Sequence, residues 1–255
     1  MDHFVIPVWL EGLSGAWLVL GAGVYLYLGR LVGAGGGKVS YRQFERRDLI
    51  LCAMFLAWFG MNVASGFNGP ERAVTAKGIM EGALLYAGIV VFIGGFLAVR
   101  GINPLRQFGI LQRNAFLCIA LAGGLLVCAY PLVLVAERLT EVALNGNGRP
   151  QNIVQYFLNV SESSDQRAMY LTIFMAVVVA PCAEETIFRG YIYGVLKRYA
   201  GPAVATLVSA GLFAAMHLSL SSLPGLFVLA LCFTLAYEAT GSLLVNILMH
   251  ALFNL

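Results

Sequence analysis

Two adjacent glutamates and an arginine four residues further on, Glu184, Glu185 and Arg189, stand in an otherwise apolar stretch of the chain. At helical spacing Glu185 and Arg189 share one face and can neutralise each other, whereas Glu184 is rotated by about 100° from Glu185. Glu184 therefore has no partner within its own helix. An unpaired carboxylate in an apolar surrounding holds a proton readily, which suits it to act as a general base. Pro181, one turn earlier, removes a backbone hydrogen bond and favours a kink.

Two further pairs at helical spacing carry neutral polar groups. His217 follows Phe213 by one turn, and Asn254 follows His250 by one turn in the apolar run from Leu243 to Leu255. An imidazole and an amide on one face could stabilise an oxyanion in a dry site. The structural alternatives are a histidine hydrogen-bonded in the core and an asparagine that meets water at a frayed helix end. For the two glutamates and the arginine, the structural alternative is an ion pair beside a glutamate that reaches the membrane surface.

The composition places these groups in a membrane. Of the 255 residues, 60% are hydrophobic and 11% are charged, where soluble domains average about 25% charged. A net charge of +3, without a basic stripe, excludes nucleic acid as a partner. We therefore expect a multi-pass protein of the cell membrane, in contact with the lipid bilayer. Five cysteines lie in or beside apolar stretches and are expected to be small hydrophobic residues without disulfides, namely Cys52, Cys118, Cys128, Cys182 and Cys232.

Charge-free runs of about 20 residues mark the membrane-spanning helices. The first four are Gly12–Gly29, Leu49–Pro70, Gly82–Val99 and Asn114–Ala136. A fifth begins at Ala168 and carries the charged motif onward to Lys197. The stretch from Tyr199 to Tyr237 has no charged residue, and Ser221–Gly225 divides it into two spans. Ala239–Leu255 supplies the last. The sequence thus predicts an all-α, polytopic transmembrane helix bundle of about eight helices, without internal repeats.

Lys and Arg gather in alternate loops of this bundle. Arg30–Asp48, Arg100–Arg113 and the end of the fifth helix, Arg189 included, hold five, three and three, whereas Glu71–Glu81 and Glu137–Arg167 hold two and three. The positive-inside rule places the first group in the cytoplasm and both termini outside. The long loop Glu137–Arg167 is polar, and we expect an interfacial helix around Ile153–Val160.

Three other features have simple structural explanations. Glu238, close to the turn at Gly241, is expected to be a loop charge. Gly190 and Gly194 form a pair of small residues one turn apart, which suits close helix packing. Met1–Leu10 contains no Lys or Arg, so we expect the first helix to be retained rather than removed as a signal peptide.

Taken together, the motifs Glu-Glu-x-x-x-Arg, Phe-x-x-x-His and His-x-x-x-Asn resemble those of the CPBP family. These are the CAAX-protease and bacteriocin-processing (ABI) intramembrane proteases, which include the Rce1-like type II CAAX prenyl endopeptidases. The stretches Ile187–Tyr191 and Thr240–Leu243 are also similar to that family. The resemblance covers the chain from about Ala168. It implies that residues 1–167 are N-terminal transmembrane helices without motifs and that residues 168–255 form the catalytic core, within a single integral unit.

The resemblance implies a glutamate-type intramembrane endopeptidase. In this scheme Glu184 and His217 activate a water that attacks a peptide carbonyl, and His250 and Asn254 stabilise the oxyanion. The other two motif residues would be structural or would orient the substrate; they are Glu185 and Arg189. The implied partner is a peptide or protein substrate, lipidated if the reaction is CAAX-type C-terminal processing, and no cofactor is implied.

Three alternatives remain open at this point. A metalloprotease could hold zinc with Glu184, His217 and His250, although the chain has no His-Glu-x-x-His spacing. A transporter or proton-relay protein could use the same intramembrane Glu and His residues, but such proteins tend to show internal repeats and paired broken helices. A non-catalytic scaffold or bacteriocin-immunity protein is the third alternative, against which the intact motifs argue.

Overall fold

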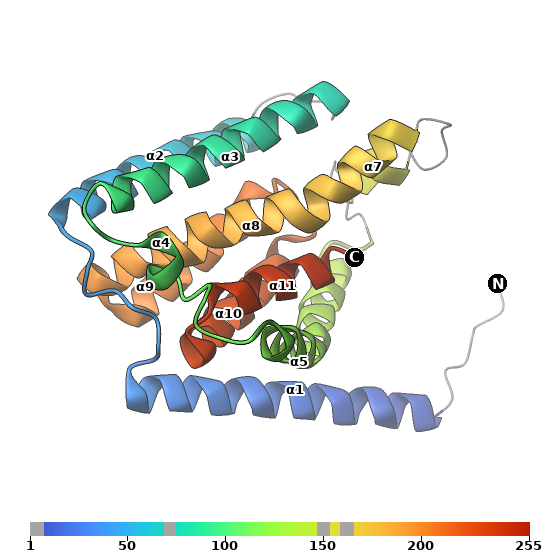
Figure 1. Cartoon of the computed structure of the whole chain (residues 1–255). Coiled ribbons are helices and arrows are strands. Elements are labelled where there is room, and N and C mark those ends of the chain that lie inside the picture. The colour runs from blue at the N-terminus through green and yellow to red at the C-terminus, as the bar shows by residue number, and fades with distance from the viewer. Residues whose placement is uncertain (1–7, 69–74, 147–153, 159–165) are drawn as a thin grey trace.

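The computed structural model describes residues 8–68, 75–146, 154–158 and 166–255, and within these ranges the regular secondary structure is entirely helical (Figure 1). Six helical segments are long and apolar enough to cross a membrane. The longest, Gln166–Met216, consists of two helices, because Gly201 has a non-helical backbone with φ 82° and ψ 164°. With the shorter apolar helix Leu243–Phe253, the described residues contain eight apolar helices. The predicted all-α polytopic bundle is confirmed.

The helices are, in chain order, α1 (Val8–Gly35), α2 (Arg46–Asn68), α3 (Ala76–Ala98), α4 (Pro104–Gln107), α5 (Ala115–Ala143), α7 (Gln166–Phe174), α8 (Ala180–Glu184), α9 (Gly194–Met216), α10 (Leu223–Thr240) and α11 (Leu243–Phe253). Two π-helical segments join α7 to α8 and α8 to α9; they are η1 (Met175–Val179) and η2 (Glu185–Tyr193). Residues 154–158 are also helical. They are the part of the expected interfacial helix that the structure describes, and the rest of that helix lies outside the described residues.

Several helices extend beyond their apolar runs. Helix α3 begins at Ala76, where the Thr75 side chain accepts a hydrogen bond from the Gly78 amide, and its first turns contain the exposed ion pair between Lys77 and Glu81. Charged residues mark where the apolar part of a helix ends, and the helix itself continues into the polar layer. The break before α10 covers 217–222 rather than Ser221–Gly225. Pro224 lies in the first turn of α10, where proline is tolerated, so the helix begins before it.

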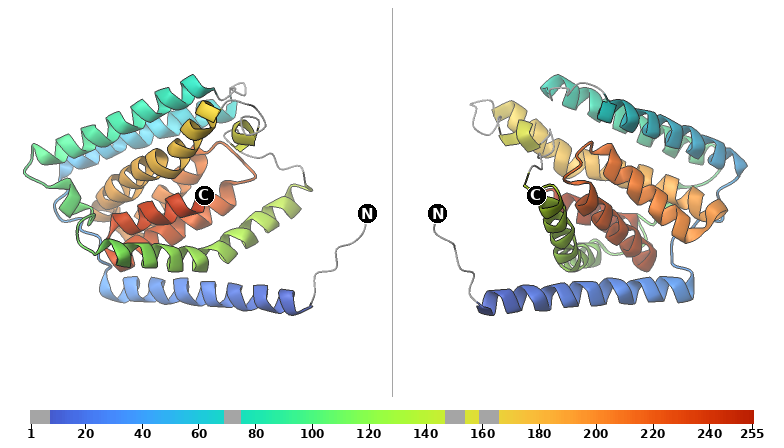
Figure 2. Two further views of the ribbon diagram at one scale, coloured as in Figure 1. Left: turned by 45° about the vertical axis from the view of Figure 1, so that its right-hand side comes forward. Right: turned by 180° about the vertical axis from the view of Figure 1, so that it is seen from behind.

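The charged motif lies in the middle of the bundle. Helix α1 packs on α5 and α10, α2 packs on α9, and α3 packs on α7, η1, α8 and η2. Figures 1 and 2 show α1 on one side of the molecule and the α2–α3 pair on the other, with α10 and α11 between them. The largest fully buried side chains on these central elements are mostly aromatic and include Phe188, Tyr191, Phe213 and Phe233. All five cysteines are free thiols, as expected.

The loops that the positive-inside rule places in the cytoplasm, which are rich in Lys and Arg, lie together at one end of the bundle, on the left of Figure 1. The Lys38 amide donates to the Glu238 carbonyl at 2.8 Å, and the Leu243 amide donates to the Phe108 carbonyl at 3.0 Å. Arg189 does not belong to this group, because it is wholly buried. Without Arg189, this group of loops still holds more Lys and Arg residues than the opposite group. The side of the membrane that this end faces stays a prediction.

Glu238 is a buried carboxylate, and the expectation of a loop charge was wrong. It is 1% exposed, within α10, and its Oε1 pairs with the Lys197 ammonium at 2.6 Å. The same oxygen accepts a short hydrogen bond from the Tyr193 hydroxyl, and Oε2 accepts one from the Val39 amide. Lys197 lies on α9 and neutralises this carboxylate on α10. The position of Glu238 near a turn gave no sign of a partner on another helix. This cluster fixes the segment after α1 to α9 and α10.

The pair Gly190 and Gly194, in η2 and at the start of α9, packs closely, as the sequence predicts, but against aromatic rings of loop residues rather than against another helix. A Cβ at Gly194 would lie 2.6 Å from the ring of Phe44, and a Cβ at Gly190 would lie 3.2 Å from the ring of Phe108. Phe44 lies in the segment before α2, and Phe108 directly follows α4. A larger residue at Gly194 would therefore displace the segment that precedes α2.

Helix α1 covers a proline turn in α5. Pro131 lies inside α5 and has no amide hydrogen, so the Val127 carbonyl receives no hydrogen bond from the residue four positions later. The Trp17 indole donates to that carbonyl at 2.8 Å. A Cβ at Gly21 would collide with the Cys128 carbonyl, so glycine allows this close approach. The contact satisfies a polar group for which the bilayer offers no partner.

We expect Trp17→Phe to lower the free energy of unfolding by about 1 kcal/mol, the size of an interhelical hydrogen bond in a membrane protein. The same substitution should cost less in a Pro131→Ala background, because alanine restores a backbone donor to Val127. The measurement is a double-mutant cycle of unfolding in detergent. Equal losses in the two backgrounds would show that the indole N–H does not replace the missing backbone donor.

Candidate active site

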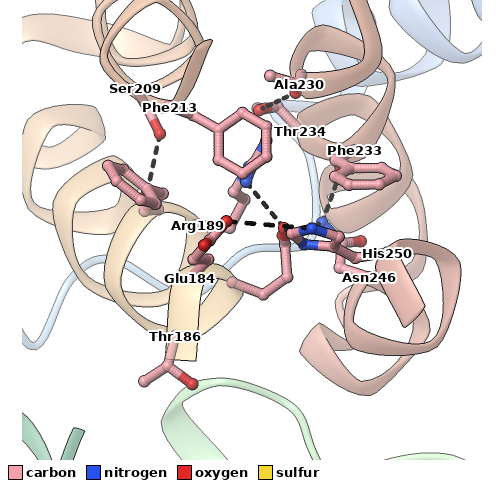
Figure 3. Close-up of polar contacts among 12 residues, drawn as sticks. Glu184, Thr186, Arg189, Ser209, Phe213, Ala230, Phe233, Thr234, Asn246 and His250 are labelled. Carbon is pink, nitrogen blue, oxygen red and sulfur yellow. Dashed lines mark hydrogen bonds and ion pairs between the residues drawn. The ribbon is translucent and has the colours of Figure 1, made fainter. Parts of the chain in front are cut away.

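A wholly buried carboxylate, that of Glu185, binds three side chains at the centre of the bundle. Its Oε1 lies 2.8 Å from Nη1 of Arg189 and 3.0 Å from Nδ1 of His250. Its Oε2 accepts a hydrogen bond of 3.3 Å from the Asn246 amide. Figure 3 shows Arg189 approaching from one side and His250 and Asn246 from α11 on the other. The predicted pairing of Glu185 with Arg189 is confirmed.

The Arg189 guanidinium lies among aromatic rings. Its Cζ is 4.2 Å from the centre of the Phe213 ring and 5.3 Å from that of Phe233, and Figure 3 shows the Phe213 ring over it. The electron-rich face of an aromatic ring attracts a cation. Nε and Nη2 of Arg189 have no hydrogen-bond partner among the described residues. The ion pair therefore lies in a buried, aromatic part of the core.

Glu184 is held differently from its neighbour. It is 8% exposed at the end of α8, and its Oε1 accepts a hydrogen bond of 3.3 Å from the hydroxyl of Tyr86 on α3. Its Oε2 is buried and has no hydrogen-bond partner among the described residues. That oxygen lies 4.0 Å from Nε2 of His250, beyond direct hydrogen-bond distance. A gap of this size between two polar groups is one that a water can bridge.

The backbone around the motif is π-helical, where the sequence predicts an α-helix. In η1 the Ala180 amide donates to the Met175 carbonyl, five residues back. Pro181 follows and has no amide hydrogen. The Ala176 carbonyl is thus left without a helical donor, and the Asn254 amide donates to it at 2.8 Å. π-Helical turns are rare and occur often at functional sites. Asn254 is exposed, yet it is tied to the helix that carries the motif.

His217 ends α9 with a defined proton position. Its Nδ1 is 2.8 Å from the Phe213 carbonyl, and a carbonyl can only accept, so Nδ1 carries the hydrogen. The neutral ring then presents a lone pair on Nε2. The Phe213 ring is 4.9 Å from the ring of His217 and 5.6 Å from that of His250. Within the described part of the chain, no hydrogen bond or ion pair joins His217 to Glu184.

His250 does not fit the simple picture of a neutral hydrogen-bond donor. Its Nδ1 faces the Glu185 carboxylate, which accepts, so this nitrogen carries a hydrogen. A neutral ring would then have only a lone pair at Nε2, the nitrogen that faces Glu184. Donation from Nε2 requires a ring that is protonated on both nitrogens.

Sequence reasoning missed two residues of this network, Asn246 and Tyr86. Asn246 stands one turn before His250 on the same face of α11, so the spacing that singled out His250 could have found it. It also donates to the Phe233 carbonyl at 2.8 Å. Tyr86 lies 98 positions before Glu184 in a helix without motifs, and no local pattern distinguishes it.

No group of three or more His, Cys, Asp and Glu side chains is arranged to hold a metal ion in the residues that the structure describes. The ligands considered for zinc, namely Glu184, His217 and His250, do not form such a group. The site is instead a carboxylate pair with one arginine, one histidine and one asparagine.

Comparison with known proteins gives one family and one relative. Residues 166–255 match the family described as "Type II CAAX prenyl endopeptidase Rce1-like". The chain is 34% identical over 94 residues to the membrane-embedded CAAX protease MroQ of Staphylococcus aureus strain USA300. This match covers 34% of the chain and 38% of the relative, so the chain spans less than half of the relative's length. No solved structure matches significantly. All three motifs lie within the segment 166–255 that matches the Rce1-like CAAX protease family.

Proposed function

We propose that this protein is an intramembrane endopeptidase that hydrolyses a peptide bond with a water activated by Glu184. The observation that carries the proposal is the buried, unpaired Oε2 of Glu184, which lies 4.0 Å from Nε2 of His250. A carboxylate with one free oxygen can bind a water and accept its proton. The match of this segment to CAAX proteases supports the same reaction.

In the proposed reaction the water oxygen attacks the peptide carbonyl carbon while Glu184 takes the proton. His217 assists by accepting a hydrogen bond from the water at Nε2. The carbonyl oxygen becomes an oxyanion, stabilised by His250 and by the second N–H of the Asn254 amide, since an amide has two hydrogens and Ala176 uses one. When the intermediate collapses, the C–N bond breaks and the proton on Glu184 passes to the leaving amine.

In this role His250 is doubly protonated, because its Nδ1 hydrogen already faces Glu185 and donation from Nε2 needs a second one. Two carboxylates, Glu184 and Glu185, then face two cations, Arg189 and His250, and the four groups have no net charge. Balanced charges are required for ionised groups to remain in a low-dielectric interior. When Glu184 accepts the proton, the new oxyanion replaces its negative charge, so the balance is kept through the step.

Glu185 and Arg189 have positioning roles in this proposal. Both are wholly buried, so neither is placed to contact a substrate. Glu185 fixes the orientation of the His250 ring by accepting from Nδ1, as the buried aspartate does in serine proteases. Arg189 neutralises Glu185, and Asn246 holds its second oxygen.

The proposed substrate is a protein with a C-terminal CAAX sequence, and lipidation of the cysteine is part of the proposal. The test uses purified protein in nanodiscs with one fluorogenic CAAX peptide in prenylated and unprenylated forms. We expect cleavage of the prenylated form, with the new terminus identified by mass spectrometry. Equal cleavage of both forms would reject the lipid requirement. Failure to cleave either form would reject CAAX processing, and a search for altered termini in membrane proteomes would then identify other substrates.

The proposed reaction uses no metal. Activity should persist after exhaustive chelation in protein shown by elemental analysis to be free of zinc. Activity that is lost on chelation and restored by zinc alone would favour the metalloprotease alternative.

A further inference from the structure

Glu184 is held by a residue outside the segment that matches the protease family. The hydroxyl of Tyr86, on α3, donates to Oε1 of Glu184 at 3.3 Å. Helix α3 packs against α8 and η2, the elements that carry the two glutamates. The matched segment begins at residue 166. The N-terminal helices therefore contribute a polar side chain to the site.

The two neighbouring glutamates differ in how firmly they are held. Glu185 accepts hydrogen bonds from three side chains. Glu184 has Tyr86 as its hydrogen-bond partner in the described residues, and the 4.0 Å separation from His250 is too long to fix it. A glutamate side chain has several rotatable bonds, so one contact decides which oxygen faces which way. The hydroxyl holds Oε1 and leaves Oε2 directed toward His250.

We propose that Tyr86 is a positioning residue for the reaction, which directs the free oxygen of Glu184 toward the water and the scissile carbonyl. This inference rests on the proposed endopeptidase function. Reactive groups must be held in a narrow range of geometries, and small displacements of a catalytic group cost large factors in rate. Tyr86 acts through Glu184 and does not itself contact the reacting atoms.

The alternative is that Tyr86 contributes only an ordinary interhelical hydrogen bond. That role would affect stability and leave the rate of the chemical step unchanged. Tyr25 provides the matched comparison, because its buried hydroxyl donates to the Leu125 carbonyl at 2.9 Å and joins α1 to α5, away from the motif. Tyr25→Phe and Tyr86→Phe each remove one buried hydroxyl that joins helices; that of Tyr25 also contacts Cys232 on α10.

The experiment measures kcat, KM and the thermal midpoint for the wild type, Tyr86→Phe, Tyr25→Phe and Glu184→Gln, on the fluorogenic CAAX peptide. We expect Tyr86→Phe to lower kcat by about 10- to 100-fold with KM unchanged. Its thermal midpoint should shift no more than that of Tyr25→Phe, and Tyr25→Phe should keep the wild-type kcat.

The outcomes separate this inference from the proposed function. If the wild type cleaves, Glu184→Gln does not, and Tyr86→Phe keeps the wild-type kcat, the positioning role is overturned and the endopeptidase proposal stands. A loss of kcat that Tyr25→Phe reproduces also overturns the positioning role. If the wild type does not cleave the peptide, the proposed CAAX processing fails. If Glu184→Gln cleaves as well as the wild type, Glu184 is not the general base. In either case this inference fails as well.

Discussion

Replacing Glu184 by glutamine is expected to reduce peptide cleavage by about 10³-fold, within the usual range for the loss of a general acid–base group. Glutamine has nearly the same size, and its amide oxygen can still accept from the Tyr86 hydroxyl. The fold should therefore survive. The substituted group can no longer accept the proton of the attacking water, so the loss should appear in kcat. The measurement is a comparison of kcat and KM with the wild type in nanodiscs.

Glu141→Gln is the matched control. Glu141 is also in a membrane helix, but it forms a surface ion pair with Arg138 at 2.7 Å. The substitution removes the same charge in an exposed position and should leave cleavage unchanged. If Glu184→Gln keeps more than a tenth of the wild-type rate, Glu184 is not the general base. A variant without cleavage that still carries a proton flux in proteoliposomes would point instead to the proton-relay alternative.

Removing the buried cation should have the largest effect on stability. Arg189→Met is expected to lower the free energy of unfolding by about 3–5 kcal/mol, because it leaves the two buried carboxylates, Glu184 and Glu185, with one cation too few. The double variant Glu185→Gln/Arg189→Met should recover most of that loss, since a neutral pair needs no compensation. Unfolding in detergent, followed by circular dichroism, gives both values.

The exposed pair again supplies a control. Arg138→Met removes an arginine from a surface ion pair and should change stability little. If the Arg189 single variant and the double variant are equally unstable, the loss comes from packing rather than from an uncompensated charge. Cleavage should stay low in the double variant, because Glu185 no longer provides a charge opposite His250.

Local spacing predicted the parts of the site that lie within one helix. The pairing of Glu185 with Arg189 follows from a separation of four residues, and it survives the change from α-helix to π-helix. The contact between Tyr86 and Glu184 spans 98 positions and depends on how α3 packs. Spacing alone carries no information on such a contact. The sequence predicted only a kink near Pro181, whereas the structure has π-helical turns on both sides of it.

The same limit applies to His250 on α11 and to Asn254, which directly follows that helix. The spacing of His250 and Asn254 predicted one shared face, but it did not predict their partners. His250 meets Glu185, whereas Asn254 meets the Ala176 carbonyl. Hydropathy, by contrast, was sufficient for the helices, because the length of an apolar run is a property of the local sequence. Glu238 could not be interpreted from the local sequence, because its partner Lys197 lies on another helix.

The hydrogen bond from Asn254 to Ala176 joins positions 78 residues apart, which has a consequence for biosynthesis. While the chain is being made, the turn before Pro181 enters the membrane with the Ala176 carbonyl unsatisfied. It remains so until α11 has been synthesised and has docked. The same helix brings His250 and Asn246 to Glu185. If the proposed reaction is correct, nascent chains that lack α11 should therefore be inactive.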